Sequence, residues 1–158
     1  MNTDNRVLLA CTNIESCLAE IDPNCEVTGS DAIYGARDGL SLTQAICHQL
    51  AAHSGWWTDL KTGLPFTLEQ VNIPEKLMLI VSEVAEAMEG ARKDLMDDKL
   101  PHRKMLEVEL ADALIRIFDL AGFLKLDLAG ATVEKLAFNQ QRADHKVENR
   151  TAENGKKF

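Results

Sequence analysis

The chain has 158 residues, a length that fits one domain with a sizeable hydrophobic core. Its net charge of −8 argues against a general DNA- or RNA-binding protein, because the phosphate backbone requires a basic face. Hydrophobic residues make up 46% of the chain and aromatic residues only 5%, with Ala, Leu, Glu and Lys abundant, which favours helices. An acidic protein can still bind nucleotides where a metal ion bridges the negative charges.

The cysteine pattern and the apolar runs predict a cytoplasmic protein. The four cysteines lie in the first third of the chain and form no C-x-x-C pair, so free thiols in a reducing compartment are expected: Cys11, Cys17, Cys25 and Cys47. The apolar run over residues 7–11 is too short for a signal peptide, and Glu15 prevents its extension toward the C-terminus. No stretch approaches the roughly 20 apolar residues of a membrane-spanning helix, so no membrane contact is expected.

Residues 1–40 are expected to form an N-terminal extension made of a helix and a loop. Apolar residues recur at helical spacing over residues 6–20, and the run Asp22, Pro23, Asn24 ends this helix. Glycines at three positions indicate a loop over residues 25–39: Gly29, Gly35 and Gly39. We attach no chemistry to this part of the chain.

A second helix is expected from Ser41, a suitable N-cap, to about His53. Trp56 and Trp57 follow it, and adjacent tryptophans at a helix end are uncommon. They are either core or subunit-interface residues, or a platform on which a nucleobase stacks. The sequence leaves both interpretations open.

A third helix begins at Asn72, because Asn72 is a good N-cap, Pro74 suits the first turn, and Glu75 completes a capping box. It ends within residues 90–93. Its apolar residues share one face: Leu77, Ile80, Val81, Val84 and Met88. Glu83 lies at the edge of that face and Glu86 beyond it.

A fourth helix is expected over residues 104–123, after a loop over residues 94–103. Its apolar stripe is formed by Leu106, Leu110, Ala113, Leu114, Ile117 and Ala121. A narrow polar stripe lies on the opposite margin and contains Glu109, Asp112, Arg116 and Asp119. Two helices therefore carry an acidic pair beside an apolar stripe.

The last helix is expected over residues 128–146, with Lys135, Asn139 and Arg142 on one face. Residues 148–158 are polar and lack periodicity, which predicts a disordered tail. No segment alternates as a strand does, so the sequence predicts an all-α protein. The expected organisation is an extension over 1–40, a helical domain over 41–147 and the tail.

The two acidic pairs predict a metal site. Glu83 and Glu86, and likewise Glu109 and Asp112, are three residues apart, so both carboxylates of a pair point the same way from a helix. If the two helices face each other, the four carboxylates form a cage for Mg²⁺, or alternatively Mn²⁺. A di-iron site would need Glu-x-x-His elements, and none of the four histidines has a Glu three residues before it: His48, His53, His102 and His145.

The spacing E-x-x-E, a gap, then E-x-x-D on consecutive helices resembles the MazG-like nucleoside triphosphate pyrophosphohydrolases. The resemblance covers residues 41–147 and extends to Lys135-x-x-x-Asn139, which Arg142 follows, as in the last helix of the family. His48 and Trp57 stand nine residues apart, as a His and a Trp do in the dCTP pyrophosphatase branch of that family. Arg116 departs from the pattern, because family members often have an apolar or aromatic residue there.

The resemblance implies a function and a site. It implies an all-α bundle completed as a homodimer or homotetramer, which cleaves a nucleoside triphosphate to the monophosphate and pyrophosphate with Mg²⁺. The carboxylates Glu83, Glu86, Glu109 and Asp112 would bind the metal, and Glu83 or Glu86 would take the proton of the attacking water. Substrate contacts would come from Lys135, Asn139, Arg142, His48 and Trp57.

Some points stay open at this stage. Arg116 either pairs with Asp119 or contacts phosphate. Without a partner subunit, Val81, Ala85 and Phe118 are expected to lack cover, which favours an oligomer. The alternative functions are a non-catalytic helical module that binds a nucleotide or metal, and a bundle with merely solvated acids.

Overall fold

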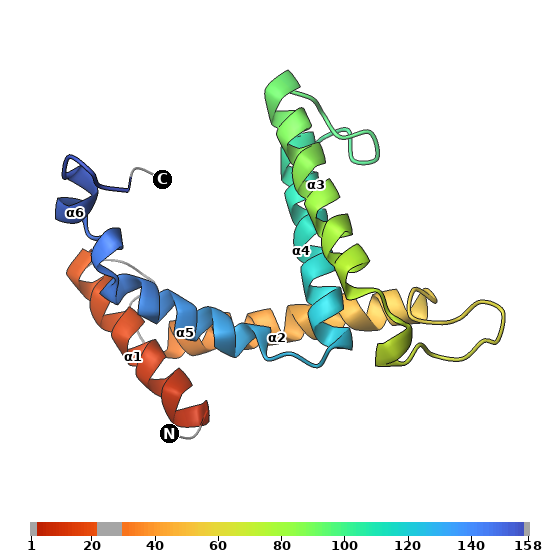
Figure 1. The fold of residues 1–158 in the computed structure, drawn as a ribbon, viewed down its shortest axis with the longest axis horizontal. Coiled ribbons are helices and arrows are strands. Elements are labelled where there is room, and N and C mark those ends of the chain that lie inside the picture. The colour runs from red at the N-terminus through yellow and green to blue at the C-terminus, as the bar shows by residue number, and fades with distance from the viewer. Residues whose placement is uncertain (1–2, 22–29, 157–158) are drawn as a thin grey trace. The chain divides into compact units, whose positions relative to one another are not determined.

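The computed structural model describes residues 3–21 and 30–156. Within these ranges all regular structure is helical, with two isolated bridge pairs and no strand, so the all-α prediction is confirmed for this part of the chain (Figure 1). None of the helices there has an apolar stretch long enough to cross a bilayer. The elements are α1 (Thr3–Ile21), α2 (Ser30–His53), η1 (Leu68–Gln70), α3 (Ile73–Lys93), α4 (Met105–Phe123), α5 (Leu128–Gln141), η2 (Ala143–His145) and α6 (Val147–Thr151).

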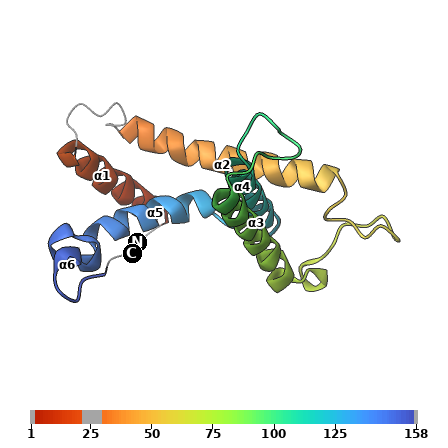
Figure 2. The same ribbon diagram turned by 90° about the horizontal axis from the view of Figure 1, so that it is seen from above.

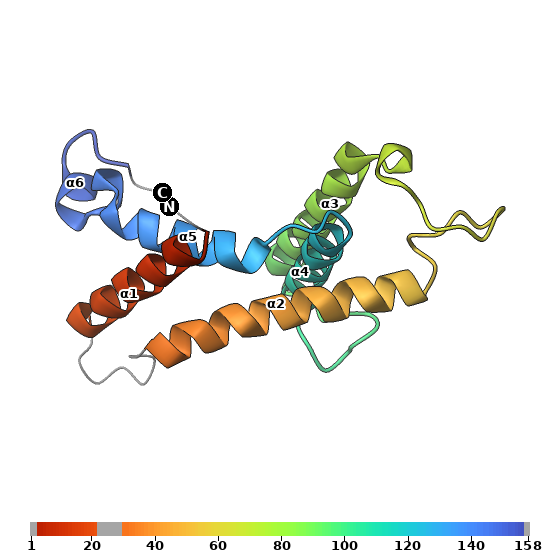
Figure 3. The same ribbon diagram turned by 90° about the horizontal axis from the view of Figure 1, so that it is seen from below.

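The chain packs into two units. The first unit contains Met1–Ser41 and Asp127–Phe158, and the second contains Leu42–Leu126. In the first unit, α1 and α5 lie side by side (Figures 2 and 3). The small apolar core of this unit also includes Ile33 of α2 and consists of Ala10, Cys11, Ile33, Val133 and Ala137. The last helix, which the sequence assigns to a domain over residues 41–147, thus packs with the N-terminal residues.

The loop predicted over residues 25–39 is wrong for the described residues 30–39, because α2 begins at Ser30. Gly35 and Gly39 lie inside this helix, and a Cβ at either position would meet no atom within 4 Å. A helical glycine costs only about 1 kcal/mol relative to alanine, and burial of Ile33 in the core of the first unit offsets that cost. Residues 25–29 and the predicted helix end at residues 22–24 lie outside the described residues.

The C-terminal region also differs from expectation. The helix α5 ends at Gln141, five residues before the predicted end, where the backbone of Arg142 becomes extended. The part of residues 148–158 that the structure describes includes most of α6, whereas the sequence predicted no regular structure there. Asn149 donates a side-chain hydrogen bond to the carbonyl of Ala143 at 2.6 Å, and this local contact ties α6 to η2.

The two described cysteine side chains, Cys11 and Cys47, are free thiols, as predicted. Burial raises the pKa of both thiols above the ordinary value. Cys25 and the side chain of Cys17 lie outside the described part of the chain.

The second unit contains a hairpin of α3 and α4, which run antiparallel and side by side in every view (Figures 1 to 3). The helix α3 starts as predicted, with the Asn72 side chain accepting a hydrogen bond from the Glu75 amide at 3.2 Å. Near its C-terminal end, Gly90 allows a close approach to α4, since a Cβ there would lie 2.9 Å from the Cβ of Met105. The predicted bounds of both helices agree with the structure to within one or two residues.

The face that α3 turns toward α4 is the acidic one. The buried residues of α3 are Glu83, Ala87 and Gly90, and those of α4 are Glu109, Ala113, Phe118, Leu120 and Ala121. Most of the apolar stripe residues are exposed instead: Leu77, Val81, Val84, Met88, Leu106, Leu110 and Leu114. Val81 and Ala85 thus lack cover within this chain, as expected, whereas the same expectation for Phe118 is wrong, because Phe118 is buried.

Gly122 sets the contact between α2 and α4. A Cβ at this position would lie 2.8 Å from Cγ of His48 and closer still to its Cβ, so the histidine packs directly on the glycine. Neither contacting atom is the far end of a flexible side chain, so one of the two helices would have to shift to admit a methyl group.

We expect Gly122→Ala to lower the free energy of unfolding by about 1–2 kcal/mol, since overpacking of about 1–3 kcal/mol outweighs the gain in helix propensity of up to about 1 kcal/mol. Urea unfolding measures the effect. Gly35→Ala is the matched control, because Gly35 lies inside α2 in open space and its replacement should stabilise slightly. Equal effects of the two substitutions would contradict the close contact.

Candidate metal and nucleotide site

Three of the four predicted metal ligands converge where α3 faces α4. One carboxylate oxygen from each of Glu83, Glu109 and Asp112 lies within 4.8 Å of the other two. Glu83 is 7% exposed and Glu109 8%, so these are not solvated surface acids. Buried carboxylates at this spacing are unfavourable unless a cation or a proton offsets their charge, and an all-oxygen donor set suits a hard divalent ion.

The fourth predicted ligand, Glu86, is exposed on α3 and lies outside this group of three. It is nevertheless close enough that its charge contributes to the raised pKa of Glu109. The sequence put Glu83 and Glu86 on one face, but the two residues differ by about 60° around the helix axis, and only Glu83 reaches the buried contact.

Arg116 supplies the positive charge at this cluster. Its Nε lies 2.7 Å from Oε1 of Glu83, so it pairs with α3 and not with Asp119, the partner considered from the sequence. Burial raises the pKa of Asp112, and the positive charge of the same guanidinium offsets part of that rise. A single half-exposed arginine therefore offsets part of the charge of three acids.

Burial and the remaining repulsion raise the pKa of two carboxyl groups. Burial, a hydrogen bond with Glu83 and the charges of Glu86, Glu83 and Asp112 raise the pKa of Glu109 from 4.5 to about 7. Burial and the charge of Glu83 also raise the pKa of Asp112. Glu109 thus keeps its proton up to about neutral pH when no metal is bound.

We expect the stability of the metal-free protein to fall as pH rises from about 4.5 to about 7. In that window folded Glu109 keeps a proton that the unfolded chain has released, so the folded state is favoured below about pH 4.5 and this contribution is lost above about pH 7. The loss is on the order of 3 kcal/mol. Urea unfolding in EDTA across this range measures it, and stability that rises through the window in wild type but not in Glu109→Gln would contradict the assignment.

Asp97 is an acid near the cluster that the sequence did not single out. It is buried in the loop between α3 and α4, where Oδ1 accepts hydrogen bonds from the amides of Lys99 at 2.9 Å and Leu100 at 2.6 Å. Its charge contributes to the raised pKa of Asp112. Asp97 followed by Asp98 in a loop has no helical spacing, so only the fold brings it close to the acidic pairs.

His48 and Trp57 lie together, but they are engaged by a third residue. Oδ1 of Asp119 accepts a hydrogen bond from Trp57 Nε1 at 2.6 Å and contacts His48 Nδ1 at 3.0 Å. Trp57 is 4% exposed, and its ring stacks on Phe123 with centroids 4.0 Å apart. The Lys76 ammonium lies 4.7 Å from the centroid of the Trp57 ring. Trp57 therefore fits the core interpretation and offers no open face for a base.

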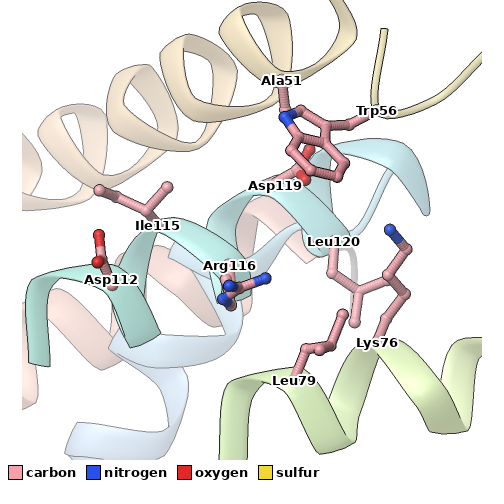
Figure 4. A pocket seen from close by; sticks show the side chains of 9 residues that line it. All are labelled: Ala51, Trp56, Lys76, Leu79, Asp112, Ile115, Arg116, Asp119 and Leu120. Carbon is pink, nitrogen blue, oxygen red and sulfur yellow. The ribbon is translucent and has the colours of Figure 1, made fainter. Parts of the chain in front are cut away.

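A pocket of about 300 Å³ adjoins the acidic cluster (Figure 4). Asp112, Arg116 and Asp119 follow one another along α4, while Lys76 comes from α3. Trp56, which is 69% exposed, also lines the pocket. The sequence left open whether the two tryptophans are packing residues or a stacking platform. Trp57 is packed, whereas Trp56 is exposed.

The predicted phosphate and sugar contacts lie in the first unit. The Lys135 ammonium is 4.8 Å from the Phe138 ring centroid, and Arg142 pairs through Nε with Asp144 at 2.9 Å. The Oδ1 atom of Asn139 is buried and has no hydrogen-bond partner among the described residues.

Comparisons with known proteins found no matching family model, no matching curated protein and no matching solved structure.

Proposed function

We propose that this protein is a Mg²⁺-dependent nucleoside triphosphate pyrophosphohydrolase, as its resemblance to the MazG-like enzymes implies. The observation that carries the proposal is the convergence of buried Glu83, Glu109 and Asp112 on the contact between two helices. The sequence supplied the acidic pairs and the fold brings three of their members together, which a row of solvated acids would not do. The raised pKa of Glu109 further supports a site prepared for a cation.

Glu83, Glu109 and Asp112 would hold the ion, with Glu86 completing the set from α3. When bound, Mg²⁺ would offset the charge of the phosphate oxygens and lower the barrier to attack by water. Glu86 is the candidate base for that water, because it is exposed, while Glu83 is buried and paired with Arg116. The attack forms an oxygen–phosphorus bond at the α-phosphate and breaks the α–β anhydride, which releases pyrophosphate.

The pocket beside the acids supports a nucleotide substrate. Arg116 and Lys76 line it and would neutralise phosphate charge, and exposed Trp56 provides an aromatic face for a base. A volume of about 300 Å³ lies at the small end of the range for ligand pockets, roughly 300–1,000 Å³.

A pyrophosphate-release screen over canonical and modified nucleoside triphosphates with Mg²⁺ tests the proposal, with Glu86→Gln as the inactive variant. Release by wild type alone supports the enzyme. No release from any nucleotide, despite metal or nucleotide binding, would favour the non-catalytic module instead. In parallel, millimolar Mg²⁺ should raise the melting temperature and EDTA should lower it, and a melting curve indifferent to both would argue against a metal site.

The exposed apolar stripes support a homo-oligomer. Leu77, Val81, Val84 and Met88 on α3 recur with helical spacing, and Leu106, Leu110 and Leu114 repeat this on α4. Two such hairpins would bury their stripes against each other as a four-helix bundle, completing an all-α fold of the NTP pyrophosphatase type. Sedimentation should give a dimer or tetramer that Leu110→Glu dissociates, whereas a wild-type monomer would contradict the proposal.

A further inference from the structure

Asp119 is the only described residue whose carboxylate joins both His48 and Trp57. Its Oδ1 lies 2.6 Å from Trp57 Nε1 and 3.0 Å from His48 Nδ1, so a single oxygen serves two rings from different parts of the chain. The indole nitrogen is a donor only, which fixes Oδ1 as an acceptor in that bond. The oxygen therefore has one lone pair left for the histidine.

The direction of the second bond follows from acid–base chemistry. Imidazole is a stronger base than a carboxylate, so the shared proton belongs on nitrogen. Nδ1 of His48 is then the donor, and in the neutral ring Nε2 carries no proton. Among the described residues the ring has no hydrogen bond at Nε2, and 27% of the His48 side chain remains exposed.

We propose that Asp119 is a positioning residue that holds His48 in the Nδ1–H tautomer, which leaves Nε2 as an unprotonated hydrogen-bond acceptor. The ring has little freedom to escape this arrangement. Gly122 packs against its Cβ and Cγ, and Trp57 and Phe123 lie edge-on at centroid distances of 5.8 and 6.3 Å. Asp119 itself lines the pocket, one turn beyond Arg116 (Figure 4).

The tautomer determines what His48 can recognise. An acceptor at Nε2 selects an N–H or O–H group of the ligand and disfavours a carbonyl at the same place, because two acceptors facing each other leave both unsatisfied. This consequence rests on the proposed function, since it takes a nucleotide as the ligand. The tautomer does not, because it follows from Asp119 alone.

Nitrogen-15 NMR of the imidazole rings tests the tautomer at about pH 8, where an ordinary histidine is neutral. His48→Gln identifies the His48 signals, and exposed His53, His102 and His145 serve as internal references. We expect wild-type His48 to be protonated at Nδ1. Protonation at Nε2 in the wild type overturns the proposal whether or not any variant folds.

Two substitutions at Asp119 separate positioning from packing. Asp119→Asn keeps a carbonyl oxygen for both donors and should retain the Nδ1–H tautomer, whereas Asp119→Leu has similar bulk but no acceptor and should lose it. An unchanged His48 spectrum in Asp119→Leu would overturn the proposal.

A ligand experiment then tests the recognition step. An α,β-methylene deoxynucleoside triphosphate should shift the Nε2 signal of wild-type His48, and KM for hydrolysis should rise about tenfold in Asp119→Leu with little change in kcat. A correct tautomer with no nucleotide response would count against the proposed function and leave the role of Asp119 intact. A nucleotide response with the Nε2–H tautomer would overturn the role of Asp119 and leave the proposed function intact.

Discussion

Glu109→Gln is expected to abolish Mg²⁺-dependent pyrophosphate release and, at the same time, to stabilise the metal-free protein. The variant loses one anionic oxygen ligand, and since even outer-shell partners of a metal are worth roughly 10–100-fold, activity should fall at least about 100-fold. Glutamine also imitates protonated Glu109, because its amide can donate to Glu83 as the carboxyl proton does. Unfolding at pH 8 in EDTA should therefore cost about 1–2 kcal/mol more than in wild type.

Glu107→Gln is the matched control for this result. Glu107 lies on the same helix but is exposed and pairs with Arg103. Its replacement should leave activity and the Mg²⁺-induced shift in melting temperature unchanged, with stability altered by less than about 1 kcal/mol. A Glu109→Gln variant that kept the Mg²⁺ shift, or that became less stable without metal, would show that the three acids do not form the ion site.

The helical hairpin was largely predictable, because its signals are local. Asn72 and Pro74 mark the start of α3, and the loop over residues 94–103 separates it from α4. Which faces of α3 and α4 meet was not predictable in the same way. Periodicity identifies Val84 and Leu110 as members of apolar faces, but it does not say whether the chain itself or another copy covers them. Here the acidic faces meet within the chain and the apolar faces remain exposed.

The site was predictable to the extent that its residues share a helix face. The spacing of Glu109 and Asp112 placed both on one side of α4, and their partner Glu83 followed from the same argument. Asp119 was visible as a member of the same polar stripe, but its bonds to His48 and Trp57 span 71 and 62 residues of sequence. Such contacts depend on tertiary packing, which no local pattern encodes, and the same is true of the pairing of Arg116 with Glu83.

Arg116→Met should destabilise the metal-free protein, and Mg²⁺ should restore most of the loss. Methionine keeps much of the bulk of the side chain but leaves Glu83, which is 7% exposed, without the cation that lies 2.7 Å away in wild type. Breaking a fully buried ion pair costs roughly 3–5 kcal/mol, and because Arg116 is half exposed we expect about 2 kcal/mol. A divalent ion bound by Glu83, Glu109 and Asp112 replaces the missing positive charge, so the variant should gain more stability from Mg²⁺ than wild type does.

The comparison that isolates this effect is Arg103→Met, because Arg103 forms an exposed pair with Glu107 near the start of the same helix. Urea unfolding of both variants and wild type, each in EDTA and in excess Mg²⁺, gives the six free energies required. Arg103→Met should stay within about 0.5 kcal/mol of wild type in both conditions, since exposed pairs contribute little. If Arg116→Met were equally neutral in EDTA, Glu83 would not depend on a cation, whereas a loss that Mg²⁺ failed to restore would mean that the ion does not take the place of the guanidinium beside Glu83.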